Sequence, residues 1–350
     1  MAQPREMIVS VDTHLGTHVG AVISKTGRLV GTLSVAAETS GYLKLLNWAS
    51  SFGRLSPAGV EGTGTYGAGL AHVLREHGIE VLEVNCPDRA ARRSRGKSDP
   101  TDAENAARAL LAGRATAIPK AQSGAAEAMR AASVARRSAV KAKTQAINQL
   151  RALLVSAPQD IRERLLRVNA SECVANCARL KSLGDTPMLK ALAATLRLLA
   201  KRYLALANEL KTLDDMLDGL TLTNAKRLRG QFGIGPQTAA VLVATAGDNP
   251  ERLKGDASLA ALCGASPLQA SSGKTVRHRL NRGGDRAANN TLLTIALVRM
   301  RSDQRTRAYV ERRTKEGKSN REIQRCLKRY IVRELYPLLL ADLGDSALLS

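Results

Sequence analysis

A heptad pattern in the middle of the chain constrains the fold more than any other feature. From residue 189 to residue 217, apolar residues recur at an unbroken alternation of three and four positions. Four heptads of apolar a and d positions predict a long helix whose narrow face is buried in a coiled coil. The residues of this pattern are Leu189, Leu192, Leu196, Leu199, Tyr203, Leu206, Leu210, Leu213 and Leu217.

The partner of this helix is either the preceding helix folding back or the same helix of another subunit. We favour an arm that contributes to oligomerisation, but the heptads do not decide between the two. The pattern also divides the chain. We expect a helical arm over residues 158–222, between an α/β domain over 1–157 and a mostly helical domain over 223–350. A chain of 350 residues has room for two or three such domains.

The order of elements in the first domain predicts its topology. Three apolar segments separated by short turns indicate an antiparallel meander, and two later strands each follow a helix. This order matches a ribonuclease-H-like fold, in which crossover strands extend the meander into a mixed sheet. The expected strands cover 7–11, 17–23, 29–35, 58–60 and 79–84, with helices over 40–48 and 70–76 and a long basic helix over 123–155. Between them we expect a helix with Asp99 as its N-cap and Pro100 as its first residue.

Four carboxylates stand where these elements converge. Asp12 ends the first strand, and Glu61 ends the fourth. Asp99 and Asp102 open the next helix, three residues apart, so both can face one point. Carboxylates brought this close repel one another unless cations lie between them. Two Mg²⁺ ions held there would stabilise the attacking and leaving oxygens of a phosphoryl displacement.

Each carboxylate also has a plain structural alternative. Asp99 beside Pro100 can cap the helix, and Asp102 can favour the positive helix end. Asp12 alone could be a turn residue at a strand end, and Glu61 alone could anchor the glycine-rich segment that follows it. The occurrence of all four in this element order favours the metal site.

The charge of the chain indicates a polyanionic partner. Lys and Arg outnumber Asp and Glu by 53 to 31, which gives a formal net charge of +22. A positive field of this size is typical of proteins that bind nucleic acid. Aromatic residues make up only 3% of the chain, so we expect contacts with the nucleic-acid backbone more than with stacked bases. No apolar run is long enough to span a membrane. The start of the chain lacks a signal-peptide pattern, and the five scattered cysteines fit a reducing cytoplasm.

Two further motifs lie after the arm. Gly233 and Gly235 flank an apolar residue before a helix rich in small residues, which resembles a helix-hairpin-helix turn that presents backbone N–H groups to a phosphate. An ordinary turn between helices is the alternative. Ser271 and Ser272 precede Gly273 in a dense cationic loop, where a hydroxyl could attack a phosphate while arginines stabilise the charge. A polar surface loop is the alternative there.

Basic residues around these motifs, together with the two glycines, are the expected nucleic-acid contacts. They come from the loop before Asp99, from the long basic helix, from the glycine turn and from the serine loop. The set is Arg92, Arg93, Arg95, Lys97, Arg136, Arg137, Gly233, Gly235, Lys274, Arg277, Arg279, Arg282 and Arg286.

Taken in order, these motifs resemble the DEDD-type transposases of bacterial insertion sequences, a family of bridge-RNA-guided serine recombinases with a RuvC-like domain. The resemblance covers nearly the whole chain. It implies that Asp12, Glu61, Asp99 and Asp102 bind Mg²⁺, as two ions and with Mn²⁺ as an alternative. It also implies that Ser272 is the nucleophile that attaches to a DNA end, with Ser271 as the runner-up. Gly284-Asp285 departs from the glycine-asparagine that relatives often have.

The resemblance implies the partners as well. These are donor and target double-stranded DNA, a noncoding bridge RNA whose pairing selects the sequence, and further copies of the chain, as a dimer that forms a tetramer on DNA. A cytoplasmic, nucleoid-associated location follows. Two other classes remain open. One is a RuvC-like structure-specific endonuclease without a serine intermediate, and the other is a non-catalytic DNA-binding protein.

Overall fold

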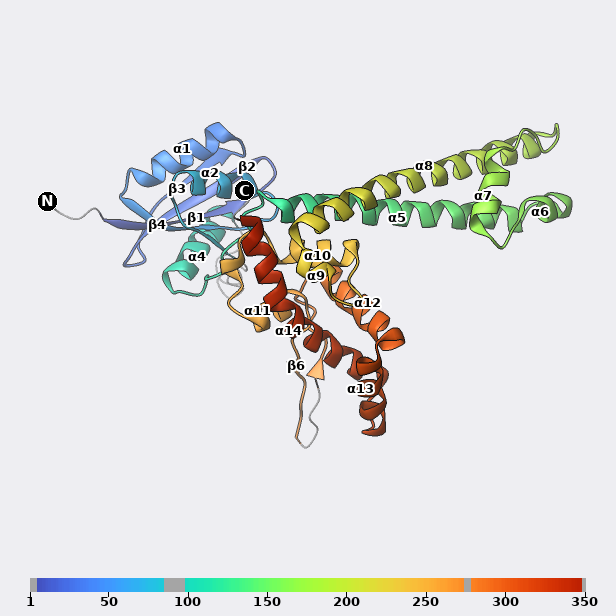
Figure 1. The fold of residues 1–350 in the computed structure, drawn as a ribbon. Helices are drawn as coiled ribbons and strands as arrows, with labels where there is room; N and C mark the ends of the chain where they lie inside the picture. Colours follow the sequence, from blue (N-terminus) through green and yellow to red (C-terminus); the bar gives the residue numbers. More distant parts are fainter. Residues whose placement is uncertain (1–4, 85–97, 274–277, 348–350) are drawn as a thin grey trace. The chain divides into compact units, whose positions relative to one another are not determined.

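The structure is a computed structural model that describes residues 5–84, 98–273 and 278–347 of the chain (Figure 1). It divides into two compact units, residues 1–121 and residues 122–350. The first unit is a mixed α/β domain, and the second is mostly helical. Residues 122–157, which we placed with the first domain from the sequence, therefore lie in the second compact unit. No helix in the described ranges combines the length and the apolar character that a membrane span requires.

A five-stranded sheet with the strand order β3-β2-β1-β4-β5 forms the first unit. The first three strands pair antiparallel, while β4 pairs parallel to β1, and β5 parallel to β4. This is the predicted meander extended by crossover strands. The strand bounds are β1 Glu6–Thr13, β2 Thr17–Ser24, β3 Leu29–Ala36, β4 Arg54–Val60 and β5 Val81–Glu83.

Helices cover both faces of this sheet. Helices α1 (Thr39–Ser50) and α2 (Ala68–Glu76) pack on one face, and α4 (Asp99–Leu111) packs on the other (Figure 1). Side chains alternate along a strand, so Val9 of β1 belongs to the core under α1 and α2 while Ile8 belongs to the core under α4. The same alternation directs the side chains at positions 10 and 12 of β1 toward the α4 face.

The start of α4 differs by one residue from the sequence expectation. The helix begins at Asp99, and its N-cap is Ser98, so Asp99 is the first helical residue and not the cap. The Ser98 hydroxyl lies 2.7 Å from the Thr101 hydroxyl, and the Asp102 amide donates to the Ser98 carbonyl at 2.9 Å. Both carboxylates still lie in the first turn, where the positive end of the helix favours them.

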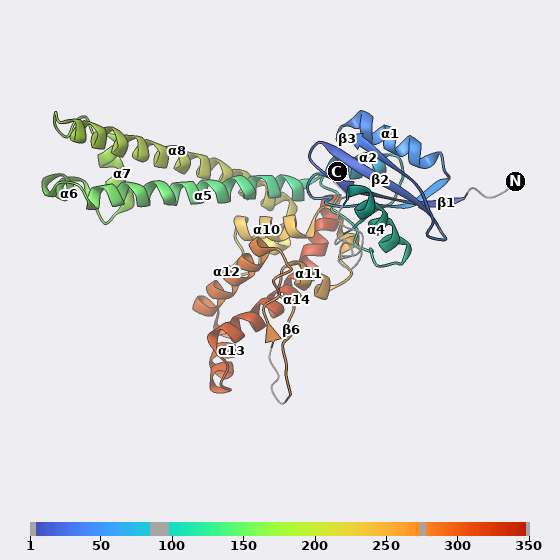
Figure 2. The same ribbon diagram turned by 180° about the vertical axis from the view of Figure 1, so that it is seen from behind.

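The second unit begins with a helical hairpin. Helix α5 (Ala125–Val155) packs lengthwise against α8 (Pro187–Asn224), as Figures 1 and 2 show from opposite sides. Helices α6 (Gln159–Leu165) and α7 (Ala170–Ala178) connect the two. All nine heptad residues are buried or half-buried. The preceding helix therefore supplies packing for the apolar face of α8 within one chain.

The remaining helices pack around α10, whose residues from Ala239 to Ala246 are all buried. Small residues along this helix allow its neighbours to approach closely. Leu242, Leu292 and Leu335 belong to one core that α10, α12 and α14 share. The elements are α9 Lys226–Arg229, α10 Pro236–Ala246, η1 Pro250–Arg252, α11 Asp256–Leu262, β6 Leu268–Gln269, β7 His278–Arg279, α12 Arg286–Ser302, α13 Gln304–Lys315 and α14 Asn320–Ala347.

Candidate active site

Asp12 lies at the end of the central strand of the sheet. It pairs with Val19 of β2 in the antiparallel register, and it is only 7% exposed. The alternation along β1 places its carboxylate on the α4 side, the side that Ile8 also faces. A buried carboxylate is costly unless a hydrogen bond or a cation compensates its charge. The position of Asp12 therefore requires a partner.

Glu61 follows β4, the strand that runs parallel to β1. Its amide donates to the Val11 carbonyl at 3.1 Å, and the Thr13 hydroxyl donates to the Glu61 carbonyl at 2.8 Å. These bonds join the ends of β1 and β4. Gly62 then turns the chain with a φ of +63°, and a Cβ at Gly67 would lie 2.5 Å from the Glu61 carbonyl oxygen. The glycines thus allow a tight turn of the backbone beside this site.

A cavity of about 210 Å³ joins three of the four predicted carboxylates. Asp12 and Glu61 line it from the strand ends, and Asp102 lines it from the first turn of α4. Asp102 is only 4% exposed. The remaining lining residues are Thr13, His14, Gly62 and Thr65.

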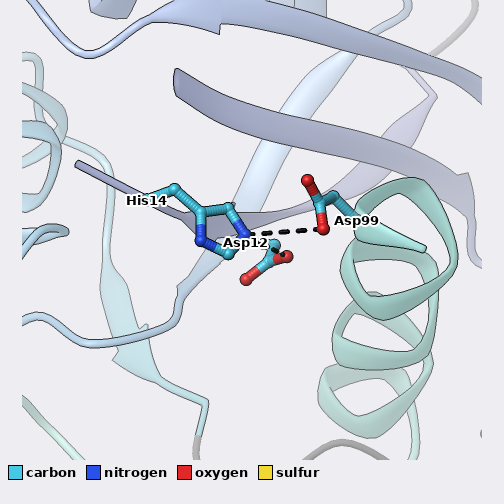
Figure 3. Close-up of side chains that lie close together, drawn as sticks. All are labelled: Asp12, His14 and Asp99. Atoms are coloured by element: carbon cyan, nitrogen blue, oxygen red, sulfur yellow. Dashed lines mark hydrogen bonds and ion pairs between the residues drawn. The ribbon is translucent and has the colours of Figure 1, made fainter. Parts of the chain in front are cut away.

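His14 links Asp99 to the cavity, because its imidazole lies close to both Asp12 and Asp99. The imidazole Nε2 of His14 lies 3.2 Å from Oδ2 of Asp12 and 3.5 Å from Oδ1 of Asp99 (Figure 3). One potential ligand atom from each of these three residues lies within 4.8 Å of the others. The structure therefore brings Asp12, Glu61 and Asp102 together in one cavity, and His14, which also lines this cavity, links Asp99 to Asp12.

His14 is the site residue that the sequence analysis missed. It stands two positions after Asp12, directly after β1 ends at Thr13, and residues two apart in an extended chain share a face. That spacing could have identified it. Carboxylate oxygens are the ligands that Mg²⁺ and Mn²⁺ prefer, and the His14 imidazole adds a nitrogen donor of the kind that transition-metal ions accept. The donor set therefore fits the divalent cation that the sequence analysis expected.

The serine loop belongs to the second unit. Strands β6 and β7 pair antiparallel through Leu268 with Arg279 and Gln269 with His278. Ser271, Ser272 and Gly273 follow β6 and are exposed, and Gly273 turns the chain with a φ of +55°. Ser272 is thus on the outer part of a short two-stranded ribbon.

The foot of this ribbon is tightly fixed. The Asp285 amide donates to the Leu262 carbonyl at 2.6 Å, and the Asp285 carboxylate accepts from the amides of Ala287 and Ala288 as the N-cap of α12. Asparagine accepts the same bonds at an N-cap. The departure from glycine-asparagine at Gly284-Asp285 is therefore compatible with this turn.

The expected nucleic-acid contacts have different surroundings. Arg92, Arg93, Arg95, Lys97, Lys274 and Arg277 lie outside the described residues. Arg137, Arg279, Arg282 and Arg286 are exposed, while Arg136 forms an ion pair with Asp214 of α8.

The expected helix-hairpin-helix turn lies between α9 and α10. Gly233 has a φ of +84°, and the Gly235 amide donates to the Thr238 hydroxyl at 2.9 Å. The positive φ explains why glycine stands at position 233.

Two cysteines of the arm lie in its core. Cys173 and Cys177 of α7 are fully buried beside Leu196 of α8. Burial raises the pKa of the Cys177 thiol to about 12, with a further contribution from Cys173. A neutral thiol behaves as a small apolar side chain, so both residues pack the arm.

Comparison with known proteins identifies the class. Residues 9–157 match a family profile for the DEDD transposase of IS110, described as a transposase, and this range contains all four carboxylates and His14. Residues 225–311 match a second profile, described as the transposase IS116/IS110/IS902 family, and this range contains the serine loop. The chain belongs to the IS110 family of transposases.

A curated relative agrees with this family. The protein "Insertion element IS110 uncharacterized 43.6 kDa protein" of Streptomyces coelicolor is 32% identical to the chain over 108 residues. The matched segment is 31% of this chain and 26% of the relative. The chain thus spans about a quarter of the length of that relative.

Proposed function

We propose that the chain is the transposase of an insertion sequence, which cuts and rejoins double-stranded DNA through a covalent serine–DNA intermediate. The observation that carries this proposal is the meeting of Asp12, Glu61 and Asp102 in one cavity of a chain whose second family match contains Ser272. The strand order of the first unit supports a RuvC-like fold for the metal-binding domain. The net charge of +22 supports a nucleic-acid substrate.

In the proposed reaction, the Ser272 hydroxyl oxygen attacks a DNA phosphorus. A bond forms between serine oxygen and phosphorus, and the bond from phosphorus to a deoxyribose oxygen breaks. That oxygen leaves as a hydroxyl by taking up a proton, which balances the proton that the serine hydroxyl loses. A hydroxyl of another strand then attacks the phosphoserine and restores a phosphodiester. Because a phosphodiester is exchanged for another, no ATP is needed.

The carboxylates of the first unit would hold the metal in this reaction. Bound Mg²⁺ would stabilise charge on the phosphoryl oxygens. Asp12, Glu61, Asp99 and Asp102 would bind two Mg²⁺ ions, or Mn²⁺, and His14 adds a nitrogen donor beside Asp12 and Asp99. Asp12 and Asp102 lie on a central strand and a packed helix turn, so their positions are fixed before any metal binds.

The proposed partners follow from charge and family resemblance. Donor and target duplex DNA are the substrates, and a bridge RNA selects their sequences by base pairing. The chain acts as a homo-oligomer, a dimer that forms a tetramer on DNA, with the α5–α8 hairpin as the arm that joins subunits. We place this assembly in the cytoplasm at the nucleoid.

Adduct trapping tests the serine intermediate. Labelled donor and target plasmids are incubated with protein, bridge RNA and Mg²⁺, the reaction is stopped with detergent, and any protein–DNA adduct is mapped by mass spectrometry. We expect the adduct on Ser272, its loss in Ser272→Ala and its retention in Ser271→Ala. If the adduct instead persists in Ser272→Ala and is lost in Ser271→Ala, then Ser271 is the nucleophile. Sequencing RNA that copurifies with the chain tests the guide, and its absence contradicts RNA guidance.

A structure-specific endonuclease is the second candidate, because the carboxylate cluster is complete within the first unit. Such an enzyme would lose cleavage in Asp102→Asn but keep it in Ser272→Ala. Binding of DNA with no cleavage by the unmodified chain, in the presence of RNA and metal, would instead indicate the non-catalytic alternative.

A further inference from the structure

A cationic pocket lies at the foot of the β6–β7 ribbon that carries Ser271 and Ser272, which we call the serine ribbon. The pocket has a volume of about 380 Å³. Its lining comes from residues 264–267 before β6, from residues 278–281, which begin with β7, from Lys318 and from the first half of α14. Six basic side chains line it, against the single carboxylate of Glu322. They are Arg279, Lys318, Arg325, Lys328, Arg329 and Arg333.

Lys328 is the buried member of this group. It is 6% exposed, and its Nζ donates to Oδ1 of Asn289 at 2.9 Å. Among the residues that the structure describes, no carboxylate forms an ion pair with it. Burial lowers the pKa of Lys328, and the nearby Arg325 lowers it further. A buried ammonium without an anion is unfavourable, so its retention here points to an anionic ligand.

Asn289 fixes the direction of the lysine. Its Nδ2 donates to the carbonyls of Cys263 at 3.0 Å and Gly264 at 2.9 Å. This bonding pattern assigns the amide nitrogen to the backbone side and leaves Oδ1 for Lys328. An ammonium has three N–H donors, and Asn289 accepts from one of them.

Two acidic groups near the pocket offset part of its charge, but among the described residues neither forms an ion pair with Lys328. Glu322 accepts from the amide of Ser319 at 2.9 Å and from its hydroxyl at 2.7 Å, at the start of α14. Asp256 pairs with Arg329 at 2.7 Å and lies 3.6 Å from Arg333. The pocket therefore keeps an excess of positive charge centred on Lys328.

We propose that this pocket binds a backbone phosphate of the DNA strand that Ser272 attacks, with Lys328 as its central donor and Asn289 as the positioning residue. The inference rests on the proposed function for the identity of the strand. Segments 264–267 and 278–281 form a wall of the pocket and also flank the serine loop at both ends. The ribbon thus connects the serine loop to the pocket wall, so a strand bound along the ribbon can place a phosphate in the pocket.

Binding of duplex DNA by Lys328→Met tests the proposal. Methionine has nearly the same length and is apolar, so it suits a buried position. The matched control is Arg321→Gln, which removes a charge from an exposed residue of the same helix that does not line the pocket. Fluorescence anisotropy with a labelled 30-base-pair DNA, at several salt concentrations, gives affinity and salt dependence.

Loss of one phosphate contact has a defined signature. For Lys328→Met we expect about tenfold weaker binding and a salt slope, log K against log salt, smaller by about one. The control should change affinity by about twofold at most. Arg325 lines the same pocket, so Arg325→Gln should also reduce the salt slope, but by less than Lys328→Met does. An unchanged slope in both pocket variants, with their melting temperatures intact, overturns the proposal.

Two comparisons separate the alternatives. If Lys328→Met weakens binding of an RNA duplex of equal length but leaves DNA binding unchanged, the DNA phosphate site is wrong. The binding test is also independent of the covalent chemistry. If the chain forms no serine adduct but Lys328→Met still lowers the salt slope by about one, the phosphate site is supported and the proposed serine chemistry is wrong.

Discussion

Gly284 lies against Gly264 so closely that a Cβ on Gly284 would be 2.2 Å from the Gly264 amide nitrogen. This contact joins the two ends of the serine ribbon, before β6 and after β7. We predict that Gly284→Ala destabilises the second unit by about 2 kcal/mol or more, because backbone must move to admit the methyl group. Thermal unfolding followed by circular dichroism measures the change.

Gly283→Ala is the matched control for that substitution. Among the described residues, a Cβ at Gly283 would meet Oδ1 of Asn281 alone, at 3.3 Å, and a small side-chain shift relieves this contact. We expect its melting temperature to stay close to that of the unmodified chain. Equal destabilisation by both substitutions would show that the close backbone contact is not the cause.

Asp102→Asn tests the carboxylate cluster as a metal site. The substitution keeps the shape of the side chain and removes its charge, so metal affinity should fall about tenfold or more. The apo chain should be at least as stable as before, because a repulsion among carboxylates is removed. Mn²⁺ titration followed by electron paramagnetic resonance, together with thermal unfolding, measures both quantities.

Glu104→Gln provides the control for Asp102→Asn on the same helix. Glu104 pairs with Arg108 one turn further along α4, and it does not line the cavity. Its substitution should leave Mn²⁺ affinity unchanged. A matching loss of affinity in both variants would indicate a general charge effect and not a ligand.

His14→Ala tests the nitrogen donor of the cluster. An imidazole contributes more to Mn²⁺ binding than to Mg²⁺ binding, so we predict that the variant loses more affinity for Mn²⁺. Isothermal titration calorimetry with each ion gives the two values. His72→Ala, which removes an exposed histidine paired with Glu76 on α2, should change neither. Equal losses for both ions would contradict ligation through the imidazole.

Leu196→Ala tests the core of the hairpin. Leu196 is fully buried, and a leucine-to-alanine change at such a site costs about 2–5 kcal/mol. Leu198→Ala is the control, because Leu198 is 68% exposed, and we expect a change of about 0.5 kcal/mol or less. Urea unfolding measures both free energies. Loss of subunit assembly in Leu198→Ala, measured by sedimentation, would place the outer face of α8 at a subunit interface.

Thiol alkylation tests the burial of Cys177. Its thiol pKa is raised from 9.0 to about 12, so the native chain should resist iodoacetamide at pH 9. Half-buried Cys326 provides an internal comparison in the same mass spectrum. Because the folded chain holds the thiol proton more tightly, this group stabilises the fold below about pH 9, and that contribution is lost as the pH rises toward 12. Rapid native alkylation of Cys177 would contradict this packing.

The sequence predicted the parts of the fold that follow from periodicity and element order. The three apolar segments and the short turns between them predicted the meander, and the order of the later elements placed Glu61 beside Asp12. The exact start of α4 did not follow, because Ser98 and Asp99 are both good N-cap residues and the sequence does not rank them. His14 did not follow from the element order, because only its two-residue spacing from Asp12 marks it as a neighbour of the carboxylates.

Other features depend on contacts that a pattern does not specify. The heptads of α8 predict a buried face but not which helix covers it, and α5 covers it through tertiary packing. Lys328 lies in a basic amphipathic helix where most cations are solvated. Its burial depends on Asn289 and on the turn at Gly264, both distant in sequence.

Both ends of the α5–α8 hairpin pack into the same C-terminal core. Met129 on the outgoing helix and Leu217 on the returning helix both belong to that core, whereas Leu150 and Leu196 pack with α7 at the distal end. Each heptad added to both helices would lengthen the hairpin by about 10 Å while leaving those core residues in place. Insertion or deletion of paired heptads would therefore change the length of the hairpin without rebuilding the core to which Met129 and Leu217 belong.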